Sequence, residues 1–249
     1  RVGFIGGMNI ADRYLDGPGW GTWRDSHFRI EGRGAAGLQA SFLSDWSATT
    51  KQRISGTEYY PPVGHFSDGI LQIVPSGPFG KWRTLLQGDS YAIAKARRRI
   101  WIQTPYYLPS EVLNSALQTA ALAGIDVRLM LPARSDSRVV DLASHSFLDD
   151  MMKAGVRILF YTPGFLHAKL LIVDDDLTVI GSANMDFRSF EHNFEVNAFV
   201  YDADFNARMA RIFENDARQS HALTPAEWFN RPRSRRWTES LMRVFSPLL

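Results

Sequence analysis

The chain contains no cysteine, almost no net charge and no long apolar run, and each absence excludes something. Without cysteine among its 249 residues it has no disulfide and no thiolate metal site, which fits a reducing compartment. Its 28 basic and 26 acidic residues leave a formal charge of +2, so no strong overall field favours nucleic acid as a partner. The uncharged stretch from Val112 to Ile125 is shorter than the about 20 apolar residues that a membrane-spanning helix needs.

Alternating strand and helix patterns run along most of the chain and indicate layered α/β structure with a parallel or mixed sheet. A hydrophobic content of 45% is enough for one bilobal domain or two fused units. Two stretches, 12–34 and 49–69, are interpreted mainly as loops. We expect strands at residues 2–5, 71–74, 99–103, 126–131, 156–160, 168–173, 178–180 and 195–201. We expect helices at residues 37–48, 82–96, 111–123, 138–154 and 203–219.

His167 and Lys169 lie two residues apart in a segment that reads as extended, so their side chains point to the same face. An imidazole, with an ordinary pKa near 6.5, can act as nucleophile or general acid and base at neutral pH. A lysine ammonium suits the charge that develops on phosphoryl oxygens. Asp174 lies an odd number of residues from both, so we assign it a supporting or orienting role at this site. The pattern predicts a site for a phosphate ester.

Further polar residues follow the next expected strand. Ser182 and Asn184, in a G-S-x-N run, can add neutral donors to phosphoryl oxygens, and Glu195 can hold one ring nitrogen of His167. A bare H-x-K pattern usually means a strand-edge histidine beside a solvated lysine, but the following motifs reverse that balance. The spacing of His, Asp and Glu residues is not that of a metal site, so we expect no metal.

The beginning of the chain repeats the pattern around Ser182. Residues 4–9 (FIGGMN) read like residues 179–184 (VIGSAN), so Gly7 and Asn9 correspond to Ser182 and Asn184. The same offset places a partner of His167 upstream of Arg1. Because the chain also opens on strand-like residues, we interpret it as one complete unit preceded by the end of another, with a truncated N-terminus.

The H-x-K-x4-D and G-S-x-N motifs resemble those of the phospholipase D superfamily, whose members pair two such units around one active site. A closer similarity is to bacterial cardiolipin synthases, and it covers nearly the whole chain. That similarity is carried by residues 4–12 (FIGGMNIAD), 104–109 (TPYYLP), 163–169 (PGFLHAK), 181–190 (GSANMDFRSF) and 193–197 (NFEVN).

The resemblance implies two α/β units with mixed sheets, related by pseudo-twofold symmetry, with the active site at their interface. Residues 1–75 would be the remainder of the first unit, 76–220 the second unit, and 221–249 a basic, amphipathic C-terminal segment. One histidine of such a pair forms a phosphohistidine, and the resemblance assigns that role to the upstream histidine. His167 would then be the general acid and base, and Asp25 would orient the absent histidine. This chain alone is therefore expected to be nearly inactive, and no cofactor is implied.

The implied reaction joins two phosphatidylglycerol molecules into cardiolipin and releases glycerol. Its implied setting is the bacterial inner membrane, with anchoring helices upstream of residue 1, anionic phospholipid as partner and no nucleic acid. A hydrolytic phospholipase or nuclease, or a non-catalytic membrane-binding module, are the alternatives. The arginines and apolar residues of 231–245 suit either an interfacial segment or a helix packed on the core. Likewise Tyr106, Tyr107, Trp20 and Trp23 either line a lipid groove or fill a core. The sequence leaves oligomeric state, acyl-chain preference and second substrate open.

Overall fold

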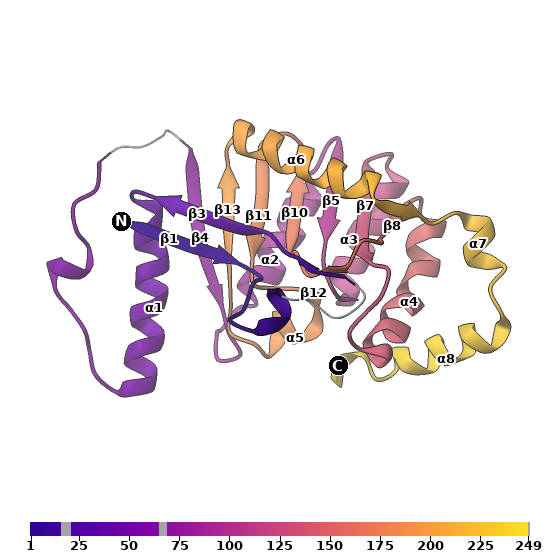
Figure 1. The fold of residues 1–249 in the computed structure, drawn as a ribbon, viewed down its shortest axis with the longest axis horizontal. Helices are drawn as coiled ribbons and strands as arrows, with labels where there is room; N and C mark the ends of the chain where they lie inside the picture. Colours follow the sequence, from indigo (N-terminus) through magenta and orange to yellow (C-terminus); the bar gives the residue numbers. More distant parts are fainter. Residues whose placement is uncertain (16–20, 65–68, 249) are drawn as a thin grey trace.

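The computed structural model describes all residues except 16–20, 65–68 and 249. Within the described part of the chain, the largest sheet has eight strands and crosses the middle of the molecule (Figure 1). Three neighbouring strands, β5 (Arg99–Gln103), β7 (Asp126–Pro132) and β8 (Arg157–Tyr161), are parallel, and the strands on either side of them pair antiparallel. The order is β14 (Ser220–Ala222), β8 (Arg157–Tyr161), β7 (Asp126–Pro132), β5 (Arg99–Gln103), β10 (Leu170–Val173), β11 (Leu177–Gly181), β13 (Glu195–Tyr201) and β4 (Ile70–Ser76).

Helices cover both faces of this sheet, which explains the unbroken apolar runs of its central strands. On one face, Leu171 and Val173 of β10 join a core with α2 (Thr84–Lys95), α3 (Glu111–Leu122) and α4 (Arg138–Lys153). On the other face, Leu170 and Ile172 pack with α6 (Ala203–Arg218), which lies along the upper edge in Figure 1. The predicted mixed α/β fold is confirmed, whereas the pseudo-twofold relation stays a prediction.

A separate two-stranded ribbon packs on the α6 side of the sheet. It pairs β1 (Val2–Gly6) with β3 (His27–Glu31), and α1 (Gly34–Thr50) follows at one side of the molecule (Figure 1). The prediction of a loop over residues 12–34 is therefore wrong for residues 27–31, which form β3. Only Ile30 of β3 is buried, so the strand has a weak apolar signal. Part of that predicted loop, 16–20, lies outside the described residues, as do residues 65–68 of the loop predicted at 49–69. That second loop also contains a short 3-10 helix, Thr57–Tyr59.

Two pairs of very short strands join separate loops to each other. β2 (Trp23–Arg24) pairs parallel with β9 (Phe165–Leu166), and β6 (Tyr107–Leu108) pairs parallel with β12 (Met185–Asp186). Two-residue strands have no periodicity, so sequence patterns cannot reveal them. These pairings fix the loops beyond the carboxyl end of β5, where the candidate site is found.

The C-terminal segment forms α7 (Pro225–Phe229), α8 (Arg233–Arg243) and a final 3-10 turn, Ser246–Leu248. One face of α8 packs on α4 through a buried ion network, in which the Arg231 guanidinium lies 2.8 Å from both Glu239 and Asp149. The segment is thus a helix docked on the core, although its opposite face is exposed. Among the described residues, every helix is too short or too polar to cross a bilayer.

Candidate active site

The short β2–β9 pair places Asp25 beside His167. Each residue directly follows its strand, and the His167 N–H donates to the Arg24 carbonyl at 2.8 Å. Asp25 Oδ2 then lies 2.8 Å from His167 Nδ1. Arg24 fixes β2 through an ion pair with Asp216 of α6, at 2.9 Å. Because the Asp25 carboxylate accepts a hydrogen bond from Nδ1–H, the geometry leaves Nε2 as the reactive nitrogen.

Lys169 covers the imidazole ring from the same short connection between β9 and β10. Its Nζ lies 3.0 Å from both ring nitrogens of His167 and donates to the His167 carbonyl at 2.7 Å. His167 and Lys169 are only 8% and 6% exposed. Burial lowers the pKa of Lys169 to about 8, although the nearby carboxylates of Asp25 and Glu195 favour its charged form. Burial also lowers the pKa of His167, and the hydrogen bond that its Nδ1–H donates to Asp25 opposes this shift. The Lys169 ammonium is therefore close to titration at mildly alkaline pH.

Gly7 lies directly against this cluster. A Cβ at this position would lie 2.6 Å from Lys169 Cδ and 2.8 Å from Asp25 Oδ1, closer than real contacts allow. Glycine is thus required for the turn after β1 to approach the lysine and the carboxylate. The structure brings Gly7, predicted as a phosphate-side residue, next to His167 and Lys169.

Aromatic rings enclose His167 on its other sides. The Trp23 ring centroid lies 4.9 Å from that of the imidazole, and the Tyr14 ring lies 5.7 Å away, edge-on. The Tyr14 hydroxyl lies 3.4 Å from His167 Nδ1 and accepts from Asn9 Nδ2 at 3.3 Å. Asn9 is thereby linked to the histidine through Tyr14. Burial raises the pKa of Tyr14, so the phenol stays protonated.

Ser182, Asn184 and Glu195 lie at the neighbouring strand ends. The pairing of Leu170 with Ile180 places Lys169 next to Gly181, so Ser182 and Asn184 follow directly beyond the lysine. The Ser182 hydroxyl donates to Glu195, and Glu195 also accepts from Asn193 at 3.1 Å. Within the described part of the chain, the buried Oδ1 of Asn184 has no hydrogen-bond partner. An unpartnered acceptor at this point is suited to a ligand that donates a hydrogen bond.

The structure corrects the expected pairing of carboxylates. We expected Glu195 to hold His167 and Asp25 to orient an absent histidine, but Asp25 holds His167 and Glu195 holds Ser182. The reason is the β2–β9 contact, which joins residues 142 positions apart. Asp25 and Glu195 occupy corresponding positions. Asp25 lies two residues before the strand partner of Gly6 in the β1–β3 ribbon, and Glu195 lies two residues before the strand partner of Gly181 in the large sheet.

Asp174 does not join this cluster. It lies in the turn after β10, with a φ of +50°, and its carboxylate accepts from the backbone N–H groups of Arg97, Arg98 and Arg99 at 2.7 to 3.1 Å. Seven residues of extended chain span about 23 Å, so Asp174 and His167 lie at opposite ends of β10. The supporting role at the site that we expected for Asp174 is therefore replaced by a structural one: Asp174 holds the start of β5 against the β10–β11 turn.

Motif spacing did not identify Asp136 and Asp186, and it left the place of four aromatic residues open. The Tyr106 hydroxyl donates to Asp136 at 2.9 Å, and the charges of Asp136 and Asp186 act on Lys169. Trp23 and Tyr106 line the site, whereas Tyr107 is fully buried in the core and Trp20 lies outside the described residues. Motif spacing cannot find such residues, because they come from separate loops.

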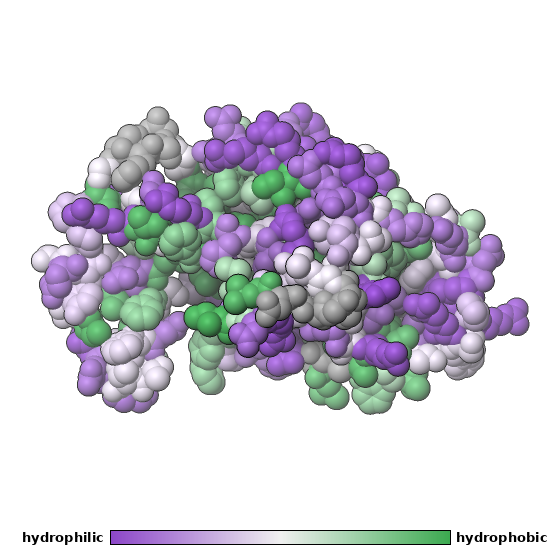
Figure 2. Space-filling model, in the orientation of Figure 1, coloured by the Kyte–Doolittle hydropathy of each residue, from purple (hydrophilic) through white to green (hydrophobic). Residues whose placement is uncertain are grey.

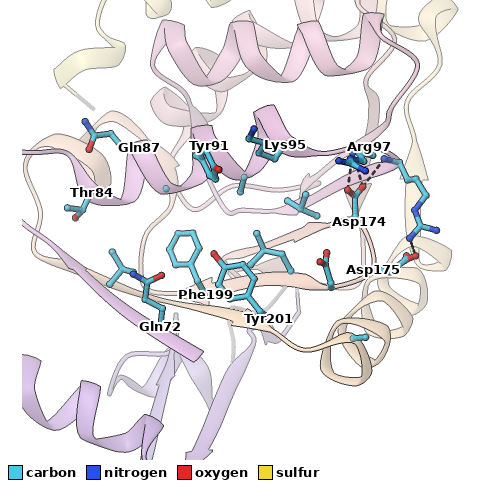
Figure 3. Close-up of a pocket in the computed structure, with 18 residues that line it drawn as sticks. Gln72, Thr84, Gln87, Tyr91, Lys95, Arg97, Asp174, Asp175, Phe199 and Tyr201 are labelled. Carbon is cyan, nitrogen blue, oxygen red and sulfur yellow. Dashed lines mark hydrogen bonds and ion pairs between the residues drawn. The ribbon is translucent and has the colours of Figure 1, made fainter. Parts of the chain in front are cut away.

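A large cavity lies at the opposite end of the sheet. It has a volume of about 1240 Å³ and lies between α2 and strands β4, β11 and β13, with Phe199 on its floor and Asp174 at its rim (Figure 3). Neither His167 nor Lys169 lines it. The chemistry of the cluster therefore marks the candidate site better than cavity size does. No group of three His, Asp or Glu side chains in the described ranges could hold a metal ion.

Comparisons with known proteins agree with this site. The family model described as "Cardiolipin synthase, PLD-like domain" matches residues 91–217, just over half of the chain. The chain belongs to this family. Among curated members, cardiolipin synthase 2 of Bacillus cereus is 44% identical over 99% of this chain and 49% of its own length. The chain spans about half the length of the curated relatives it matches.

Two solved structures resemble the chain in fold. Phosphatidylserine synthase of Haemophilus influenzae aligns with 99% of this chain and 67% of its own, with a TM-score of 0.70 and 15% identity. Nuc, a phospholipase D family member of Salmonella typhimurium, aligns with 63% of this chain and 99% of its own, with a TM-score of 0.53 and 20% identity. At these identities the likeness establishes the phospholipase D-like fold and nothing about substrate.

Proposed function

We propose that this chain provides one half of the active site of a cardiolipin synthase, which joins two phosphatidylglycerol molecules and releases glycerol. The observation that carries the proposal is the buried cluster of Asp25, His167 and Lys169, closed by Gly7. It combines a proton carrier of fixed tautomer with one ammonium, in a place where little water screens either. Membership of the cardiolipin synthase family supports phosphatidyl transfer as the reaction.

The charge of the cluster supports a half-site. One ammonium faces the carboxylates of Asp25, Glu195, Asp136 and Asp186, all of which act on Lys169. A phosphodiester is an anion, so the described residues alone give it more negative than positive surroundings. The relatives are twice as long as this chain, and their other half is where a second histidine and lysine would come from. By the same reasoning, this chain alone is nearly inactive.

In the proposed reaction, a histidine of the other half attacks phosphorus and the first glycerol leaves as its oxygen takes a proton from His167 Nε2. A phosphatidyl-histidine results, with a new N–P bond in place of the O–P bond. The hydroxyl of a second phosphatidylglycerol then gives its proton to Nε2 and attacks phosphorus, which releases the histidine. Lys169 and Asn184 hold the phosphoryl oxygens. Asp25 stabilises the imidazolium that His167 must be before the first step, and that forms again as the second alcohol gives up its proton.

A product assay on the full-length protein tests the proposal. Vesicles of phosphatidylglycerol should yield cardiolipin and glycerol in equal amounts, without added metal. Phosphatidic acid as the main product would replace transfer by hydrolysis, the alternative that the Nuc-like fold keeps open. Cleavage of DNA in preference to lipid would indicate a nuclease. Lipid binding without any product would indicate a membrane-binding module, and each of these three outcomes overturns the proposal.

Membrane setting is proposed on the same grounds. The substrate is a bilayer phospholipid, and the family's curated members are cardiolipin synthases. We propose the bacterial inner membrane as the location, with any anchoring helices in the half that this chain does not include. Fractionation of cells that express the full-length protein tests this, since activity in the cytosolic fraction would contradict it.

A further inference from the structure

Helix α8 presents an apolar stripe to solvent. Trp237, Leu241 and Val244 are 78%, 59% and 72% exposed, and their spacing of four and three residues places them on one face of the helix. The opposite face holds the buried Glu239, which pairs with Arg231. The ion network therefore fixes the orientation of α8, so the apolar stripe cannot turn inward.

Arginines flank the stripe. Residues 231–249 contain five arginines and one glutamate, and the glutamate is buried. Arg236 and Arg243 approach acidic partners only at 3.5 Å and remain nearly half exposed. No acidic side chain in the described part of the chain pairs with Arg233, which is exposed. An apolar stripe with a basic border is complementary to a bilayer that contains anionic lipid.

The stripe continues towards the candidate active site. Phe245 and Leu248 extend it with exposed side chains, and the turn Ser246–Leu248 packs against α5 (Phe187–Glu191), which begins just beyond Asn184. In Figure 2, apolar residues gather at the part of the lower edge where Figure 1 places the C-terminal turn, between α5 and α8.

A second apolar group lies at the same end of the sheet. Phe79 and Phe194 are exposed and their rings lie 6.0 Å apart, on loops next to Ser76 and Glu195, which pair at the site end of β4 and β13. Trp82, exposed nearby in sequence, carries Lys81 over its ring at 5.1 Å. The site thus lies between two exposed apolar and basic borders.

We infer that α8 and the C-terminal turn form a docking surface for an anionic phospholipid bilayer, which brings the catalytic end of the sheet to the lipid headgroups. The inference rests on the proposed function, since a phosphatidyl-transferring site needs access to lipid in a bilayer. The inference adds which surface of the protein contacts the bilayer. Burial of Leu241 in the bilayer interface and attraction of the arginines act together, and neither needs a membrane-spanning helix.

A fluorescent label on α8 tests this in the full-length protein. Because this chain lacks cysteine, Leu241→Cys provides a unique attachment point within it, and Leu122→Cys is the matched control. Leu122 is an exposed leucine at the end of α3, close to the start of β7 and so at the end of the sheet opposite His167. The protein is placed in nanodiscs of phosphatidylcholine, with or without phosphatidylglycerol, that contain a lipid-borne quencher.

The Leu241 label should shift to blue emission and be quenched with phosphatidylglycerol present, and the Leu122 label should not change. A blue, unquenched Leu241 label in every nanodisc would mean that protein covers the stripe, and it would overturn the inference. Equal quenching with and without phosphatidylglycerol would overturn the claim that the surface requires anionic lipid.

A charge variant provides a second, independent test. Arg233→Gln should weaken partition into phosphatidylglycerol vesicles about fivefold, whereas Arg53→Gln, an exposed arginine beyond α1, should not. Equal loss in both variants would overturn the inference. Turnover of short-chain phosphatidylglycerol in detergent separates this result from the proposed function. Cardiolipin formed there without docking of α8 refutes only the inference, and docking without cardiolipin refutes only the proposed function.

Discussion

At the start of β10, His167 and Lys169 are buried, close to each other and adjacent to Asp25 and Gly7. At its other end, Asp174 lies in a turn, and its carboxylate accepts hydrogen bonds from three backbone N–H groups at the start of β5. Both ends belong to one H-x-K-x4-D motif. The first end holds buried titratable groups with shifted pKa values, which is typical of a reactive site. The second end is fully hydrogen-bonded, which is typical of structure.

The largest effect should come from His167. In His167→Gln, the side chain can still hydrogen-bond to Asp25 but cannot carry a proton between alcohols, so cardiolipin formation should fall about 10²–10⁴-fold. Product formation from phosphatidylglycerol vesicles by the full-length protein measures it, and an unchanged unfolding midpoint serves as the control. Near-normal turnover would show that the His167 end of β10 is not the reactive site.

Gly7→Ala should have the next largest effect, through geometry alone. The added methyl overlaps Lys169 Cδ and the Asp25 carboxylate, so the ammonium must move. A displacement of about 1 Å at reacting groups costs about 100-fold in rate. Gly64→Ala is the matched control, because its methyl would meet nothing within 4 Å. Similar rates in both variants would show that the turn after β1 does not shape the site.

The two ends of β10 also differ in how much the sequence could predict. Face parity predicted that His167 and Lys169 converge, and unbroken apolar runs predicted β10 and β11, because these depend on local periodicity. The contact of Asp25 with His167 depends on two-residue strands from distant parts of the chain, which have no periodic signal. For Asp174, the motif spacing predicted a supporting role at the site, but the residue lies in the turn after β10 and adopts a positive φ.

Asp174→Ala should lower stability without lowering the rate of the folded enzyme. It leaves three backbone N–H groups without their carboxylate, at a cost of about 1–3 kcal/mol in the free energy of unfolding. Asp174→Asn should lose less, since an amide oxygen still accepts and asparagine tolerates the positive φ. Denaturant unfolding and turnover per folded molecule are the measurements. Lost turnover at normal stability would return Asp174 to the catalytic group.

The smallest effect concerns pH and separates the two ends once more. An ammonium loses its proton as pH rises through its pKa, and burial has lowered the pKa of Lys169 from 10.5 to about 8. If the charged form holds the phosphoryl oxygens, turnover should fall above about pH 8 and be about tenfold lower at pH 9 than on its plateau. Lys169→Arg keeps its charge over this range, so its slower turnover should lose the alkaline fall. Asp174→Ala should keep the parent's alkaline fall, because that carboxylate is remote from the lysine. An alkaline fall that persists in Lys169→Arg would assign the titration to another group.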